Sequence, residues 1–166
     1  MVRRSSAPAA LRFVLLVLAL PLAGCPDDDA AVFVEASIAA PAAAVEQETL
    51  GTVLGGGFDL ALHLGPRASG ASQVSVGAFA LQNADQSQTL VPTLALSATP
   101  PFPVEVGIDN DVVVGVSFGT GDGLLPVAAY DEICAAGELV ISGAVQDSLQ
   151  DGSTPVASSP FLPDGC

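Results

Sequence analysis

The chain has 166 residues, with 18 acidic residues against four Lys and Arg, and a formal net charge of −14. Half of the residues are hydrophobic and the mean hydropathy is positive, which is opposite to the composition of disordered chains, so the chain can bury a core. Proteins bind nucleic acid largely by neutralising phosphates with Lys and Arg, so this composition excludes nucleic acid and anionic lipid surfaces as partners.

The first 24 residues have the features of an export signal. Arg3 and Arg4 give a positive start, and an apolar run of ten residues, 13–22, follows. This run is shorter than the roughly 20 residues that a membrane-spanning helix needs. A positive start followed by a short apolar segment is typical of a secretory signal peptide. We therefore expect residues 1–24 to be a signal peptide that is removed.

The residues Leu22-Ala23-Gly24-Cys25 resemble the lipobox of bacterial lipoproteins. The resemblance implies that Cys25 becomes the mature N-terminus and carries acyl chains, such as palmitate, on its sulfur and its amine. Stable anchoring needs at least two membrane signals, which a multiply acylated N-terminus supplies. We therefore expect the protein to be bound to a membrane through lipid, in the cell envelope of a Gram-negative bacterium, on the periplasmic or outer surface.

An acidic segment follows the predicted lipid site. Pro26 and three aspartates, 27–29, predict a solvated tether over residues 25–31 that anionic headgroups repel. Loss of the signal peptide removes three of the four arginines, so the mature chain has 18 acids against Arg67 alone and a formal charge of −17. Residues 32–166 are of ordinary size for one domain, and we predict a single β-sandwich domain there.

Apolar residues in this domain recur with period two, which indicates strands. Phe58, Leu60, Leu62 and Leu64 alternate with more polar residues, and a similar pattern follows over 112–118. Clusters of Gly, Pro, Asn and Asp separate the runs, which predicts an all-β, antiparallel β-sandwich, immunoglobulin-like or similar, of seven or eight strands. The expected strands are 32–39, 49–64, 72–82, 88–98, 102–109, 112–119, 138–149 and 154–162.

Three local features refine this prediction. The Ala-rich segment 39–44 is compatible with a linker or with a turn of helix. A bulge at Gly77-Ala78 restores the alternation between Val76 and Phe79. Pro92 places its strand at a sheet edge, because proline cannot donate to a ladder of hydrogen bonds.

Two cysteines remain once Cys25 carries lipid, and an exported chain meets an oxidising compartment. We therefore predict a disulfide between Cys134 and Cys166. Asp151-Gly152 is typical of a type I′ turn, and a turn there places Cys166 opposite residue 137. The bridge then closes the open end of the last hairpin, and closing a loop of this length contributes about 3–4 kcal/mol.

His63 is the only histidine of the chain. The alternation places it on the face opposite Leu62 and Leu64, where a solvent-facing histidine is the favoured interpretation. The alternative is a hydrolase in which His63 acts as a base beside a loop carboxylate.

Carboxylates gather in the predicted loops. Asp109 and Asp111 lie in one turn, and Asp122 lies in the Gly-rich loop 119–123. Calcium takes six to eight oxygen ligands, so these three are the candidate calcium ligands. The alternative is structural, because turn aspartates bond to nearby backbone. No other cofactor is expected.

Two glycine-rich stretches, Gly55–Gly57 and Gly119–Gly123, lack the lysine of a phosphate-binding loop and are interpreted as turns or bends. We recognise no complete catalytic set and expect a protein that is not an enzyme. The expected function is a structural or protein-interaction role among other envelope proteins. The alternatives are a calcium-stabilised adhesion or ligand-binding module and the hydrolase that uses His63.

Overall fold

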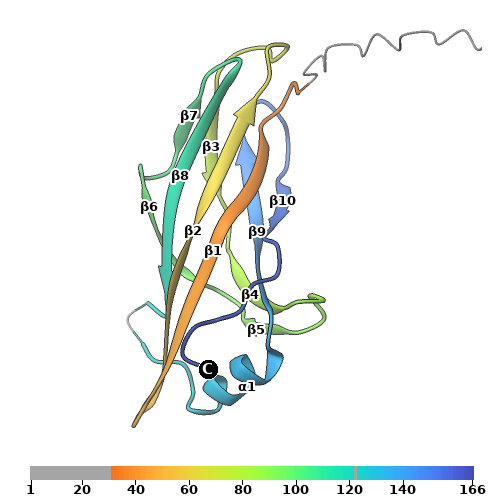
Figure 1. Ribbon diagram of the computed structural model, residues 1–166. Coiled ribbons are helices and arrows are strands. Elements are labelled where there is room, and N and C mark those ends of the chain that lie inside the picture. Colours follow the sequence, from red (N-terminus) through yellow and green to blue (C-terminus); the bar gives the residue numbers. More distant parts are fainter. Residues whose placement is uncertain (1–30, 122) are drawn as a thin grey trace, which may run out of the picture.

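The computed structural model describes residues 31–121 and 123–166, and it consists of two antiparallel β-sheets with one short helix at the end of the molecule (Figure 1). The predicted all-β, antiparallel sandwich is confirmed. The predicted signal peptide, the lipobox with Cys25 and residues 25–30 of the predicted tether lie outside the described residues.

The two sheets differ in the length of their strands. The first sheet has the order β1-β2-β8-β6, with β1 (Glu35–Glu48), β2 (Gly51–Leu64), β8 (Asn110–Gly119) and β6 (Ala95–Thr99). The second sheet contains β3 (Ser72–Val76), β4 (Ala80–Asn83), β5 (Thr89–Val91), β7 (Val104–Val106), β9 (Leu139–Asp147) and β10 (Thr154–Ala157). Strand β9 pairs with β10 on one side and with both β3 and β4 on the other. The long first sheet therefore sets the long axis of the molecule.

The core lies between the two sheets and is filled by the residues that alternate inward. Phe58, Leu60, Leu62 and Leu64 of β2 are all buried, as the period of two predicts. The Phe58 ring stacks on that of Phe79 at a centroid distance of 5.3 Å and lies 6.3 Å from that of Phe118. These three rings join both sheets at the centre, where aromatic contacts add to the burial of apolar area.

The structure has ten strands because the predicted strands 72–82 and 88–98 are each divided in two. The predicted strand 72–82 is β3 followed by β4, and the three residues 77–79 between them face only Gly143 and Ala144 of β9. The extra residue lies at the position of the predicted bulge and turns Phe79 into the core. A Cβ on Gly143 would lie 2.5 Å from the Phe79 ring, so glycine leaves the space that the ring occupies.

The Ala-rich segment 39–44 is part of strand β1 and is neither linker nor helix. The register between β1 and β2 shifts between Ala39 and Ala42, and Ala40 has a φ of 47°. The interpretation of Gly55–Gly57 as a turn or bend is wrong, because all three lie within β2. A Cβ on Gly56 would lie 2.2 Å from the Ala42 carbonyl oxygen, so the bulged β1 approaches β2 too closely for a side chain.

The helix α1 (Ala128–Ala136) was not predicted from the sequence. Its buried residues are Ala129 and Ile133, one turn apart, which is too little for a visible helical period. It lies at the end of the molecule where the β1–β2 turn and the last residue also lie (Figure 1). Across the described part of the chain, no helix has the length and apolar character that crossing a membrane requires.

The predicted two-residue turn at Asp151-Gly152 is wrong. Thr154 pairs with Val145, so the loop between β9 and β10 spans the six residues 148–153. The turn residues lie inside this longer loop, because β9 ends at Asp147, whose side chain is held by neighbouring segments. The register that placed Cys166 opposite residue 137 therefore does not form.

Candidate functional site

Cys134 and Cys166 form a disulfide, with their Cα atoms 5.4 Å apart. The predicted pairing is therefore present in the structure. Its surroundings differ from the prediction, because Cys134 lies in α1 and the bridge ties Cys166 to this helix. The bridge does not close a simple hairpin.

Residues 158–166, here named the C-terminal strap, contact both sheets. Phe161 exchanges backbone hydrogen bonds with Leu139 of β9. Asp164 then accepts a hydrogen bond from the Val45 N–H at 2.9 Å and donates one to the Ala43 carbonyl at 2.8 Å. The strap thus crosses from the second sheet to the first, and the disulfide fixes its end.

Asp147, at the end of β9, is the most elaborately bonded buried group. Only 4% of its surface is exposed. One carboxylate oxygen accepts a hydrogen bond from the Val34 N–H at 2.8 Å. The other accepts from the Ser72 hydroxyl and from the Leu149 N–H. The carboxylate therefore fixes the chain just before β1 against β3 and the β9–β10 loop.

Two opposing effects act on the pKa of Asp147. Burial raises the pKa because it disfavours the charged form, and the hydrogen bonds from Ser72, Leu149 and Val34 lower it. The hydrogen bonds together prevail, and the pKa of Asp147 lies below its ordinary value. The carboxylate is therefore ionised at neutral pH and serves as an acceptor.

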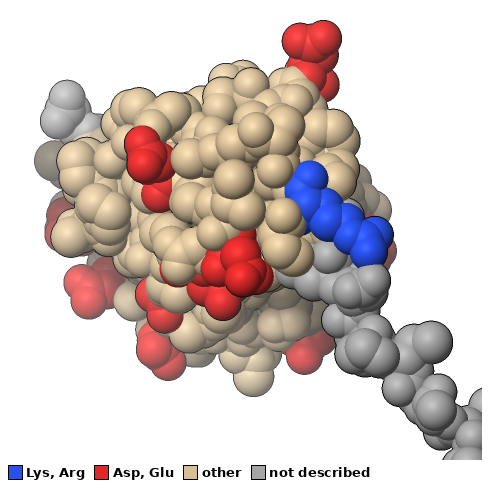
Figure 2. Space-filling view, turned by 90° about the horizontal axis from the view of Figure 1, so that it is seen from above, with Lys and Arg blue, Asp and Glu red and all other residues tan. Residues whose placement is uncertain are grey.

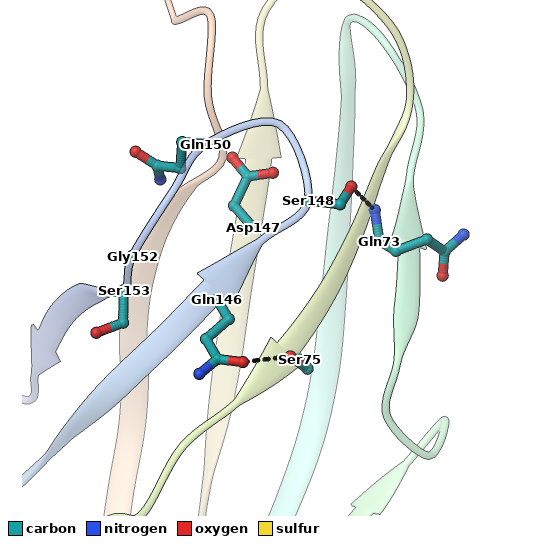
Figure 3. Close-up of a pocket in the computed structure, with 8 residues that line it drawn as sticks. All are labelled: Gln73, Ser75, Gln146, Asp147, Ser148, Gln150, Gly152 and Ser153. Atoms are coloured by element: carbon teal, nitrogen blue, oxygen red, sulfur yellow. Dashed lines mark hydrogen bonds between the residues drawn. The ribbon is translucent and has the colours of Figure 1, made fainter.

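An open polar hollow of about 470 Å³ lies beside Asp147, on β3, β9 and the loop that follows β9 (Figure 3). Gln73, Ser75, Gln146 and Ser148 are among the residues that line it. Ser75 donates to the Gln146 side chain at 3.3 Å, and the Gln73 N–H donates to the Ser148 hydroxyl at 2.9 Å. Its polar groups therefore bond partly to one another.

His63 lies on the outer face of the first sheet, as the alternation predicts. Its Nδ1 lies 2.7 Å from a carboxylate oxygen of Asp111, the residue directly opposite on β8. Both line a hollow of about 450 Å³ that Ser37 of β1 also lines. The register places Ser37 opposite Ala61, two residues along β2 from His63. This arrangement supplies the base and the carboxylate of a Ser–His–Asp site on one sheet face.

One motif has the spacing of a nucleophile elbow: Gly115-Val116-Ser117-Phe118-Gly119. A working elbow requires a sharp turn between a strand and a helix. Here the whole motif lies within β8, and Ser117 pairs with Gly57, six residues along β2 from His63. Six strand residues span roughly 20 Å, so His63 cannot activate Ser117.

The three candidate calcium ligands do not form one described group. Asp109, with a φ of 55°, precedes β8, and the carboxylate of Asp111 contacts His63. Asp122 lies outside the described residues, and the loop that contains it follows the other end of β8. Within residues 31–121 and 123–166, no three His, Cys, Asp or Glu side chains converge to hold a metal ion. The calcium site stays a prediction, which a calcium-dependent rise in melting temperature would support.

The charge of the surface is almost entirely negative. Figure 2 shows the end at which the described chain begins, with acidic residues around it and a single blue residue. This residue is Arg67, the only Lys or Arg among residues 31–166. A partner that binds this protein by charge must therefore be basic.

Comparisons of the chain with protein-family models, with curated proteins and with solved structures find no match, so its function has to be argued from its own residues.

Proposed function

We propose that this protein is a lipid-anchored lipoprotein of the Gram-negative cell envelope with a non-catalytic role, as a structural component or as an interaction partner of other envelope proteins. The observation that carries the proposal is the sequence Leu22-Ala23-Gly24-Cys25, followed by Pro26, three aspartates and then a β-sandwich.

The place where the chain enters the folded part supports a tethered arrangement. The Val34 N–H is held by the buried Asp147 only nine residues after Cys25. Seven residues of tether, 25–31, span at most roughly 25 Å when fully extended. A lipid on Cys25 would therefore hold the sandwich close to the bilayer. The Cys134–Cys166 disulfide agrees with an exported protein, because such bonds persist in oxidising compartments.

Metabolic labelling with palmitate tests the anchor. We expect the full chain to incorporate the label and to partition with membranes, and Cys25→Ser to abolish both. The double variant Cys134→Ser/Cys166→Ser is the matched control, since it removes the other two cysteines and should keep the label. Label that persists in Cys25→Ser would overturn the lipid assignment.

Hydrolysis with His63 as the base is a second candidate function. The contact of His63 with Asp111, in a hollow that Ser37 also lines, favours it. A panel of esters and amides tests it with the wild type, His63→Ala and Ser37→Ala. Turnover that both substitutions abolish would establish the hydrolase and refute the non-catalytic role. Turnover that survives His63→Ala would eliminate this candidate.

A further inference from the structure

Three large apolar side chains are exposed together where the β1–β2 turn meets the segment before α1. Leu50 is 86% exposed, and Leu124 and Val127 are 44% and 46% exposed. We name this group the apolar tip. Contiguous exposed apolar side chains on a folded protein mark interaction sites more often than isolated ones do.

The backbone around the apolar tip is held in place. Thr52 exchanges two backbone hydrogen bonds of 2.9 Å with Leu125, and its hydroxyl donates to the Pro126 and Val127 carbonyls. A Cβ on Gly51 would lie 2.6 Å from the Leu124 Cβ, so Leu124 packs directly over the residue after Leu50. The tip is therefore a fixed surface, and binding would require little ordering of the backbone.

Acidic residues lie on the two elements that adjoin the apolar tip. Glu46 and Glu48 are exposed on the adjoining end of β1, and Asp131 and Glu132 are exposed on α1, which packs against β1 and β2. Arg67, the only Lys or Arg among the described residues, lies beyond the opposite end of β2. An apolar centre with an acidic rim complements an apolar pocket ringed by Lys and Arg.

The apolar tip lies at the end of the first sheet that faces away from the chain entry. Strand β1 starts at Glu35 and runs for 14 residues to the turn that contains Leu50 (Figure 1). At about 3.3 Å per residue this places the tip roughly 45 Å from the start of β1. A lipid-anchored protein would therefore present the tip away from its own bilayer.

We propose that the apolar tip is the docking site for a separate envelope protein that has an apolar pocket ringed by Lys and Arg. This proposal rests on the proposed function for the location of the partner, and it names the surface that would bind it. A second copy of the chain is a poorer occupant, because it offers an acidic rim and no lysine, and like charges in an interface repel.

In-cell photo-crosslinking tests the proposal on the full, membrane-bound chain. A benzophenone amino acid replaces Leu50 in one strain. In the matched control it replaces Val113, which is 61% exposed on the outer face of β8. We expect one discrete adduct from position 50 and none of that size from position 113. Mass spectrometry of the adduct should identify a protein with a basic surface around an apolar pocket.

Charge provides the second arm of the experiment. Glu46→Gln/Glu48→Gln should lower the yield of the adduct about fivefold, as should high salt, because the attraction across an exposed rim is screened. The proposal is overturned if there is no adduct, if the adduct forms only with lipid or a second copy, or if its yield is unaffected by charge.

Palmitate labelling of the same strains reports the anchor separately. An adduct from position 50 in a strain whose Cys25 is intact but carries no label would refute the anchor and keep the docking site.

Discussion

At the scale of single residues, Asp147 has a role that only the folded chain reveals. Its partners Val34 and Ser72 are 113 and 75 residues away in the sequence. In the sequence it is one of many acids near a turn, and alternation along β9 gives no sign that its carboxylate is bonded at three points. His63 behaves differently, because its outward direction follows from the apolar residues beside it on β2, whereas its contact with Asp111 depends on the register with β8.

We expect Asp147→Asn to lower the free energy of unfolding by about 2–4 kcal/mol. The amide is uncharged and has only one acceptor oxygen, so all three hydrogen bonds lose their charged acceptor and at least one donor loses its acceptor altogether. Urea unfolding at neutral pH measures the change. Asp151→Asn, at an exposed position of the following loop, is the control and should change stability by less than about 0.5 kcal/mol. Equal effects of the two substitutions would contradict the role of Asp147.

The same carboxylate should make stability depend on pH in acid. The pKa of Asp147 is lower in the folded protein than its ordinary value of 3.8. Its contribution is therefore fully present above pH 3.8 and is lost as the pH falls through the lower folded-state pKa. We expect Asp147→Asn to flatten this part of a plot of unfolding free energy against pH. If the variant loses as much stability in acid as the wild type does, other carboxylates account for that loss.

Two adjacent glycines of β2 offer a matched pair of substitutions. A Cβ at Gly56 would lie 2.2 Å from the Ala42 oxygen and 2.5 Å from the Phe118 ring, whereas a Cβ at Gly55 meets nothing within 4 Å. We expect Gly56→Ala to destabilise the protein by about 1–3 kcal/mol through overpacking, and Gly55→Ala to be neutral or slightly stabilising. Thermal unfolding of both variants decides this. Similar melting temperatures would mean that β1 and β2 can move apart at the bulge.

At the scale of elements, strands with a continuous apolar face could be predicted, whereas helix α1 and the Ala-rich second half of β1 could not. Strands β2 and β8 bury one face over most of their length, so their period of two is plain in the sequence. Helix α1 buries only Ala129 and Ile133, which leaves no period to detect. The predicted register of the last hairpin was wrong for another reason. Asp151-Gly152 favours a tight turn locally, but the hydrogen bond between the Leu149 N–H and Asp147 belongs to a longer loop.

The C-terminal strap yields a prediction for the disulfide. Replacing both Cys134 and Cys166 by Ser should lower the free energy of unfolding by about 3–4 kcal/mol, because the open chain gains entropy when unfolded. The amides of Val45 and Asp164, which bond the strap to β1, should exchange with deuterium faster in this variant. Reductant should destabilise the wild type and leave the variant unchanged. Unaltered exchange at these amides would show that the strap holds without its bridge.

At the scale of the whole molecule, negative charge is the dominant property. Residues 25–166 hold 18 acids against Arg67 alone, so self-repulsion opposes the compact state. We expect the melting temperature of the protein to rise as salt increases from about 0.01 M to 0.1 M, where the screening length falls from about 30 Å to about 10 Å. Sodium and potassium chloride should act alike. A rise with only one cation would indicate specific binding of that ion.

Strand β1 begins where the chain enters the folded part and runs directly away from that point, and this has a mechanical consequence. Strand β1 leads away from the entry point and is paired with β2 along nearly its full length. If the entry is pulled while the far end is held, the force acts along the strand direction. The interstrand bonds then carry the load in shear and must fail together, whereas a pull across the strands would open them one by one. Such a body would transmit tension along its length before it yields.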